Sequence, residues 1–94
     1  MLEIDTRNIY DSAEVFKCLS SENRLKILSY TLEMEVSQAT LAKLLNLSHS
    51  TISVHGEKLR RSGLVTVRRD EYNNKYIRAV HRKIQVSILP PSTD

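Results

Sequence analysis

The sequence has 94 residues, of which 40% are hydrophobic and 27% charged, and its net charge is +3. We expect one domain over residues 1–94, because a chain this short buries only a modest core, and such folds often gain stability by pairing with a second copy. No run of about 18 apolar residues indicates a membrane span, and the first residues do not resemble a secretory signal. The single cysteine, Cys18, excludes an internal disulfide and favours a reducing, cytoplasmic setting.

Positive charge gathers in one third of the chain. Residues 1–45 contain five Lys/Arg and seven Asp/Glu, whereas residues 56–83 contain nine Lys/Arg and three Asp/Glu, a balance of +6. Such a patch suits a polyanion, because neutralising phosphates releases counterions. Charge alone supports equally well a solvated basic face that has no partner.

The first two helices are predicted from caps and from the spacing of apolar residues. We expect one helix to begin at Asp11, because Asp11 can cap it and Glu14 three residues later resembles a capping box. Ser20-Ser21 ends this helix and caps a second one from about Glu22 to Met34. Both helices have apolar faces, at Val15, Phe16 and Leu19 and then at Leu25, Leu28 and Leu32.

A tight turn joins the next two predicted helices, which span residues 38–45 and about 49–62. The apolar stripe of the first of these is Leu41, Leu44 and Leu45, and Asn46 can end it in the left-handed conformation. A turn of three residues forces the two helices to cross steeply, with Ala42 at the close approach. The serine before each helix is its expected cap, namely Ser37 and Ser48.

After Gly63, which can end a helix through a positive φ, the apolar period changes to two. Residues 64–67 and 75–80 predict two strands of a hairpin around a polar tip at 70–74, and residues 84–88 predict a third strand before Pro90-Pro91. Val36 is interpreted as a connector. The expected fold is α+β and mainly α: a winged helix-turn-helix with four helices, a hairpin called the wing (residues 64–80) and a C-terminal strand. The helix-turn-helix itself spans residues 37–62.

This arrangement predicts binding to double-stranded DNA. The helix after the turn begins with small polar side chains that can reach base edges in a major groove, although they are poor helix formers. The predicted reading residues are Ser48, His49, Ser50, Thr51, Ser53 and Val54. The competing interpretation is that these residues only cap and solvate the helix.

Basic and polar residues of the wing and of the end of the fourth helix are predicted to contact phosphates or the minor groove. They are Lys58, Arg60, Arg61, Arg68, Arg69, Tyr72, Asn73, Asn74, Lys75 and Arg78. For Arg60 and Arg61, balancing the helix dipole is an equal alternative.

Three stretches resemble ArsR-type winged-helix repressors, over residues 14 to about 80. Residues 19–28 (LSSENRLKIL) resemble the LS-x-x-x-R-L-x-I-L opening of that family, and residues 47–55 (LSHSTISVH) resemble its LS-x-x-T-[VI]-S-x-H recognition helix. Gly63-Leu64-Val65 matches the GLV that enters the family's wing. The resemblance implies a homodimer that binds a roughly palindromic operator, with Gln38, Ser48, His49, Ser50, Thr51 and Ser53 facing DNA.

The sequence departs from the family's metal sensors. Ser37 and Ala39 stand where those proteins have two cysteines, and residues 84–89 contain no His or Cys. We therefore expect no metal and no cofactor. Gly56 replaces the usual bulky residue after His55, although glycine inside a helix costs about 1 kcal/mol relative to alanine.

The remaining candidate residues do not form a catalytic site, and no enzyme activity is expected. His55 falls on the apolar face of its helix, which favours a packed, hydrogen-bonded residue over a metal ligand. His81 is expected at the surface or facing a phosphate. Cys18 is expected to be buried, with a redox switch at a dimer seam as the alternative.

Two other functions remain open at this stage: a winged helix that binds a protein partner, and a sensor of a ligand or of oxidation. The terminal segments 1–10 and 82–94 hold more apolar residues than a minimal winged helix needs: Leu2, Ile4, Ile9, Ile84, Val86, Ile88 and Leu89. They are expected to form a seam between two copies or, alternatively, to cover the core of one copy.

Overall fold

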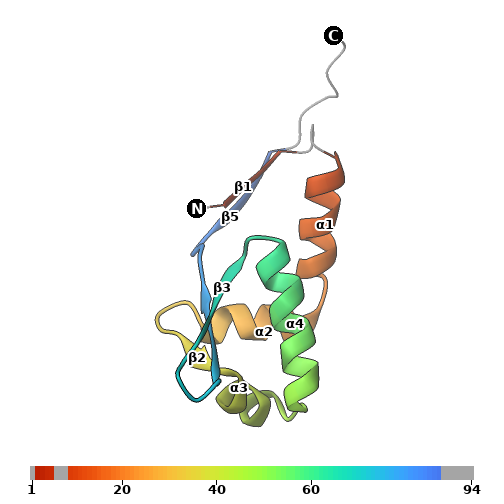
Figure 1. The fold of residues 1–94 in the computed structure, drawn as a ribbon. Coiled ribbons are helices and arrows are strands. Elements are labelled where there is room, and N and C mark those ends of the chain that lie inside the picture. Colours follow the sequence, from red (N-terminus) through yellow and green to blue (C-terminus); the bar gives the residue numbers. More distant parts are fainter. Residues whose placement is uncertain (1, 6–8, 88–94) are drawn as a thin grey trace.

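A computed structural model describes residues 2–5 and 9–87 and has nine elements in this part of the chain (Figure 1). They are β1 (Leu2–Asp5), α1 (Ile9–Leu19), α2 (Glu22–Tyr30), β2 (Val36–Ser37), α3 (Gln38–Leu45), α4 (His49–Arg61), β3 (Val65–Arg69), β4 (Lys75–Ala79) and β5 (Ile84–Ser87). Four helices followed by a β-hairpin confirm the expected winged helix-turn-helix. None of the helices in these ranges is long and apolar enough to cross a membrane.

The first two helices differ from the prediction at one end each. Helix α1 already begins at Ile9, so Asp11 lies inside it and the predicted cap is wrong. Helix α2 ends at Tyr30 rather than Met34. Buried Thr31 is its C-cap: the N–H makes the last helical bond, to the Ile27 carbonyl at 3.1 Å, and the hydroxyl donates to the same carbonyl at 2.9 Å. The Thr31 carbonyl accepts the N–H of Ala79 in β4, so a tertiary contact replaces the next helical bond.

The helix-turn-helix follows the prediction closely. Ser37 and Ser48 cap α3 and α4, each accepting the backbone N–H three residues later at 3.1 Å. Asn46 has a φ of 53°, and the N–H of Leu47 bonds to the carbonyl of buried Ala42, which holds the two helices at a close crossing. Leu44 is the exception: it is 49% exposed and does not belong to the apolar stripe of α3.

The wing is part of a sheet of three strands in the order β2-β4-β3. Strands β3 and β4 pair antiparallel from Val65↔Ala79 to Arg69↔Lys75, around the predicted tip. The prediction that Val36 is a connector is wrong, because Val36 pairs with Ile77 and extends the sheet toward α3. A two-residue strand gives too short a run for a period of two to be seen.

The core lies between the helices and this sheet. Its fully buried side chains come from α2, α3, α4 and β4: Ile27, Leu41, Ile52, Leu59 and Ile77. Gly56 is buried on the face of α4 that packs against Ile77, which accounts for a glycine inside this helix. Leu25, predicted on the apolar face of α2, is 49% exposed, because that face turns Ile27 rather than Leu25 into the core.

A second sheet joins the two ends of the described chain (Figure 1). Strand β5 pairs parallel with β1, in the register Leu2↔Ile84 to Asp5↔Ser87, and Ile4 is buried. The predicted C-terminal strand is thus confirmed as far as Ser87, but its partner β1 was not predicted. Ile88, Leu89 and Pro90-Pro91 lie outside the described residues.

Candidate nucleic-acid interface

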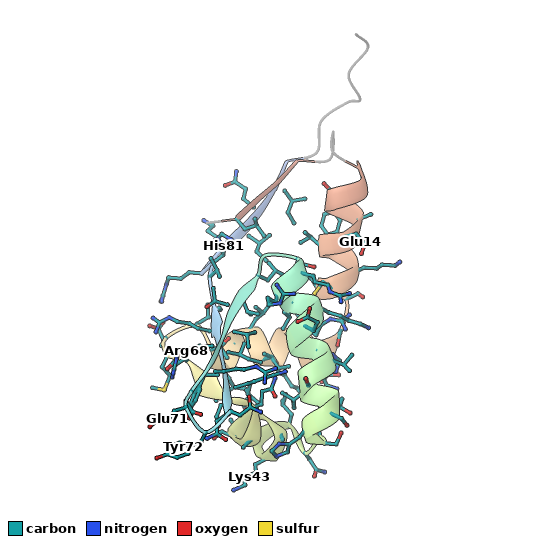
Figure 2. The ribbon with its side chains drawn as sticks, viewed as in Figure 1. Glu14, Lys43, Arg68, Glu71, Tyr72 and His81 are labelled. Atoms are coloured by element: carbon teal, nitrogen blue, oxygen red, sulfur yellow. The ribbon has the colours of Figure 1, made fainter. Side chains whose placement is uncertain are left out.

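The starts of α3 and α4 face the inner side of the wing across a groove of about 550 Å³. This groove brings together six residues that are far apart in the sequence and that were all predicted to contact DNA: Gln38, His49, Arg69, Asn73, Asn74 and Lys75. Three separate elements therefore present polar side chains to one surface. In Figure 2, Lys43 of α3 and Tyr72 of the wing mark the end of the molecule where these elements meet.

The first turn of α4 is held by its own hydroxyl groups. Ser48 Oγ lies 3.0 Å from Ser50 Oγ, donates to Thr51 Oγ1 at 2.8 Å and accepts the N–H of Thr51. Ser48, His49 and Ser50 are exposed. A helix N-terminus with exposed N–H groups and short polar side chains, and with no acidic residue in its first turn, favours an anion or a base edge.

The tip of the wing is a tight turn built on Asp70. Its carboxylate accepts the N–H groups of Tyr72 and Asn74, both at 2.9 Å. These bonds, first of all the one from Asn74, lower the pKa of Asp70. Asn73 has a φ of 66°, and its side chain accepts a hydrogen bond from Arg69. Tyr72 is 78% exposed, so the turn projects a ring into solvent.

Strand alternation divides the basic side chains of the wing between two faces. Arg69 and Lys75 form a register pair on the face toward α4, and Lys75 Nζ donates to Ser53 Oγ at 3.3 Å. Arg68 and Arg78 lie on the opposite face. The sequence prediction treated these four cations as one group, because it did not assign faces.

Three of the predicted cations form ion pairs within the protein. Arg68 donates to the Glu35 carboxylate at 3.1 Å and stacks over the Tyr76 ring, 4.6 Å from its centroid. Arg60 and Arg61 both bond to Glu57, which lowers the pKa of that carboxyl to about 2. Glu57 lies about one turn before Arg60 and Arg61 on α4, whereas Glu35 precedes β2, and β4 lies between β2 and the strand of Arg68.

Arg24 of α2 is a residue that the sequence analysis did not single out. It is half-buried and donates to the carbonyls of Cys18 and Lys17, at 2.6 Å and 3.1 Å, and to Nδ1 of His55 at 3.3 Å. One guanidinium thus ties the end of α1 to α4. The signal was present, because Arg24 is the arginine of the LS-x-x-x-R-L motif.

The other singled-out residues are placed as follows. His55 is half-buried, and burial, followed by the charges of Arg24 and Lys58, lowers its pKa. Cys18 is buried, as predicted. Within residues 2–5 and 9–87, no group of three or more His, Cys, Asp or Glu side chains is arranged to hold a metal ion.

Comparison with known proteins agrees with this architecture. Residues 21–67 match the model of the bacterial regulatory protein arsR family. The transcriptional activator HlyU of Vibrio cholerae is 38% identical over 64 residues, which are 68% of this chain and 59% of HlyU. The structure of reduced HlyU superposes with a TM-score of 0.69 at 32% identity, covering 80% of this chain and 78% of that one.

Two further relatives extend the comparison. The homodimeric winged helix-turn-helix DNA-binding domain from Mycobacterium bovis, solved by NMR, has a TM-score of 0.70 at 27% identity, covering 78% of this chain and 67% of that one. The uncharacterized HTH-type transcriptional regulator YceK of Bacillus subtilis is 36% identical over 67 residues, 69% of this chain and 66% of YceK. The chain thus spans less than two thirds of the length of HlyU and of YceK.

Proposed function

This chain belongs to the arsR family of bacterial regulatory proteins, and from that premise we propose that it regulates transcription by binding specific sites on double-stranded DNA. The observation that carries the proposal is the groove in which the starts of α3 and α4 meet Arg69 and Lys75 of the wing. A convex helix start beside a basic hairpin matches the shape and charge of a major groove with its flanking phosphates.

The start of α4 supplies the contacts to bases. Its exposed hydroxyl, imidazole and Val54 side chains lie where they can donate to base edges or meet a thymine methyl group. Gln38 reaches the same groove from the start of α3. The proposed reading residues are Gln38, Ser48, His49, Ser50, Thr51, Ser53 and Val54.

The phosphate contacts come from the wing and from the end of α4. Arg69, Asn73, Asn74 and Lys75 face the groove, and Tyr72 extends the tip. Arg68 and Arg78, on the outer face of the wing, and Lys58, Arg60 and Arg61, at the end of α4, serve flanking phosphates. For Arg60, Arg61 and Arg68, binding requires that the carboxylate now bonded to them be exchanged for phosphate.

We propose further that the protein acts as a dimeric repressor. The Mycobacterium bovis relative is homodimeric, which supports a pair of copies here. In this proposal strands β1 and β5 contribute to the seam, while Leu2 and Ile84 also pack against the core of their own copy. Two copies would place their α4 helices in successive major grooves about 34 Å apart. Sedimentation of the protein at micromolar concentration checks the dimer, and a reporter gene behind the selected site checks repression against the activation named for HlyU.

The experiment that tests the function is selection of bound duplexes from random DNA, followed by fluorescence anisotropy with the selected and a scrambled duplex. We expect preference for the selected duplex and an affinity that falls steeply with salt. An absence of binding to any duplex at about 50 mM salt, where phosphate contacts are strong, contradicts the proposal.

A further inference from the structure

A second hollow, of about 500 Å³, lies behind α4, at the opposite end of that helix from the DNA-facing groove. It lies where the end of α1, the start of α2 and the end of α4 meet, and Glu14 and Cys18 form part of its wall. Figure 2 shows Glu14 on α1, far from Glu71 and Tyr72 at the tip of the wing. The volume lies within the range of about 300–1,000 Å³ that small-molecule sites occupy.

The wall of this hollow carries a surplus of positive charge. Of the described residues that line it, four are cations and Glu14 is an acid, and one of the cations, Arg61, is bonded to Glu57: the cations are Lys17, Arg24, Lys58 and Arg61. Within the described part of the chain, Lys17 and Lys58 have no ion-pair partner. These two lysines are therefore available to an anion.

The helix geometry explains how so many cations are tolerated together. Lys17 lies in the last turn of α1, and Lys58 and Arg61 lie in the last turn of α4. The negative end of each helix dipole favours cations at these positions. Arg24 is fixed in place by two carbonyls, of Lys17 and Cys18, so its orientation does not depend on a ligand.

The positive charges that line the hollow also act on a neighbouring side chain, His55. The pKa of His55 is lowered by burial and by the charges of Arg24 and Lys58, so two of the lining cations already act on a ring beside the hollow. An anion bound among the four cations would relieve their mutual repulsion.

We propose that this hollow, lined by Lys17, Arg24, Lys58 and Arg61, is a binding site for a small dianion that carries carboxylate or phosphate groups. Carboxylate and phosphate oxygens both accept charge-assisted hydrogen bonds, which the two lysines and the Arg24 N–H groups not already bonded to Cys18, Lys17 and His55 can donate.

The proposed anion site is connected to α4, the helix whose start carries the proposed reading residues. Arg24 bonds to His55 on α4, and Lys58 and Arg61 belong to α4 itself. A bound dianion cancels positive charge at one end of this helix and therefore lowers its affinity for DNA. This effect on DNA affinity rests on the proposed function, whereas binding of the anion does not.

The experiment is an NMR titration of backbone amides with sodium phosphate and, separately, with sodium succinate, at ionic strength matched with sodium chloride. We expect saturable shifts around Lys17, Ser20 and Ser62, and the stronger of the two probes identifies the group that the site prefers. Lys17→Ala should weaken binding of the preferred probe about tenfold, the effect of one lost charge-assisted contact. The control is Lys43→Ala, an exposed lysine on α3 outside the hollow, which should leave binding unchanged.

Shifts that do not saturate with either probe overturn the proposal, and so does equal binding by wild type and Lys17→Ala. The link to DNA is measured separately, by anisotropy with the selected duplex. Added probe should weaken DNA binding of the wild type more than sodium chloride of equal ionic strength does, and Lys17→Ala should lose this difference. Because the amide titration contains no DNA, failure of the proposed function leaves its result intact.

Discussion

A Cβ atom on Gly56 would lie 3.0 Å from Cδ1 of Ile77, which is closer than most Cβ contacts, so any larger residue on α4 would require the Ile77 side chain of β4 to shift by a few tenths of an ångström. Ile77 is fully buried and has little room to move. The position of the wing beside α4 therefore depends on the absence of a side chain at Gly56.

We predict that Gly56→Ala lowers the free energy of unfolding by about 1 kcal/mol, because the cost of overpacking exceeds the gain in helix propensity. In an Ile77→Val background the Cδ1 atom is absent, and the same substitution should become neutral or stabilising. Urea denaturation of the four proteins of this double-mutant cycle measures the coupling. Equal destabilisation by Gly56→Ala in both backgrounds would show that the contact with Ile77 is not the cause.

Arg24 provides a second test of the fold. Arg24→Ala should cost about 1–3 kcal/mol, because it removes three hydrogen bonds from a charged donor and takes that donor from the part-buried Cys18 carbonyl and His55 Nδ1, whereas the Lys17 carbonyl still accepts from Ser20. The matched control is Lys26→Ala, two residues away, which removes only an exposed ion pair with Glu22 and should change stability by less than about 0.5 kcal/mol. Thermal or urea unfolding compares the two variants, and similar losses would contradict the assigned role of Arg24.

His55 makes the stability depend on pH in a predictable direction. Arg24 can only donate, so Nδ1 of His55 must accept, which requires a neutral ring. Because the folded pKa lies below the usual 6.5, the unfolded chain binds a proton first, and stability falls as the pH falls from 6.5 toward the folded pKa. Above 6.5 the contribution is complete. The free energies of unfolding measured above and below pH 6.5 should differ less for His55→Gln than for the wild type. A pH dependence equal to that of the wild type would refute the assignment.

Substitutions at the start of α4 and in the wing should change DNA binding in different ways. His49→Ala, at the start of α4, should reduce the preference for the selected duplex over a scrambled one, by about 1–3 kcal/mol if a base contact is lost. Arg69→Ala should weaken both duplexes alike and reduce the salt slope by about one unit. Anisotropy titrations at several salt concentrations separate these effects. If Arg69→Ala loses the preference for the selected duplex, or if His49→Ala weakens binding to both duplexes equally, the roles of the two residues are the reverse of those proposed.

Glu35 is predicted to restrain DNA binding, because it holds Arg68. Glu35→Gln should free this guanidinium for a phosphate, raise affinity for any duplex and steepen the log–log salt dependence by about 0.9. Glu33→Gln is the matched control: it removes the same charge but releases Arg82, which lies outside the wing. The same salt series measures both variants, and an identical response in both would mean that net charge alone is responsible.

The sequence predicted the parts of the fold that depend on local signals. Ser37, Asn46 and Ser48 act through backbone groups within three residues, and all three have their expected role. The Asp11 cap is a local signal that failed, since α1 begins at Ile9, but two other wrong assignments involve partners distant in the chain. Thr31 ends α2 because Ala79 takes its carbonyl, and Val36 becomes a strand because β4 lies beside it.

In the candidate site, too, features that depend on contacts distant in the chain were missed. Six residues that line the groove were named from the sequence, but Tyr76 was not. The pairing of Arg68 with Glu35 and the separation of Arg68 from Arg69 by strand alternation were also missed, because both depend on register. Gly56 lacked an explanation for a similar reason. Its partner, Ile77, is on a strand that folds back only after the wing has turned.

The parallel pairing of β1 with β5 has a consequence for the order of folding. Leu2 contacts Ile84 only after nearly the whole described chain has been brought into a closed loop, so this pairing carries the largest loop-closure entropy in the domain. The helix-turn-helix, built from contacts close in sequence, can form before it. We therefore expect the two terminal strands to join last during folding and to separate first in hydrogen exchange, while the DNA-facing elements stay protected.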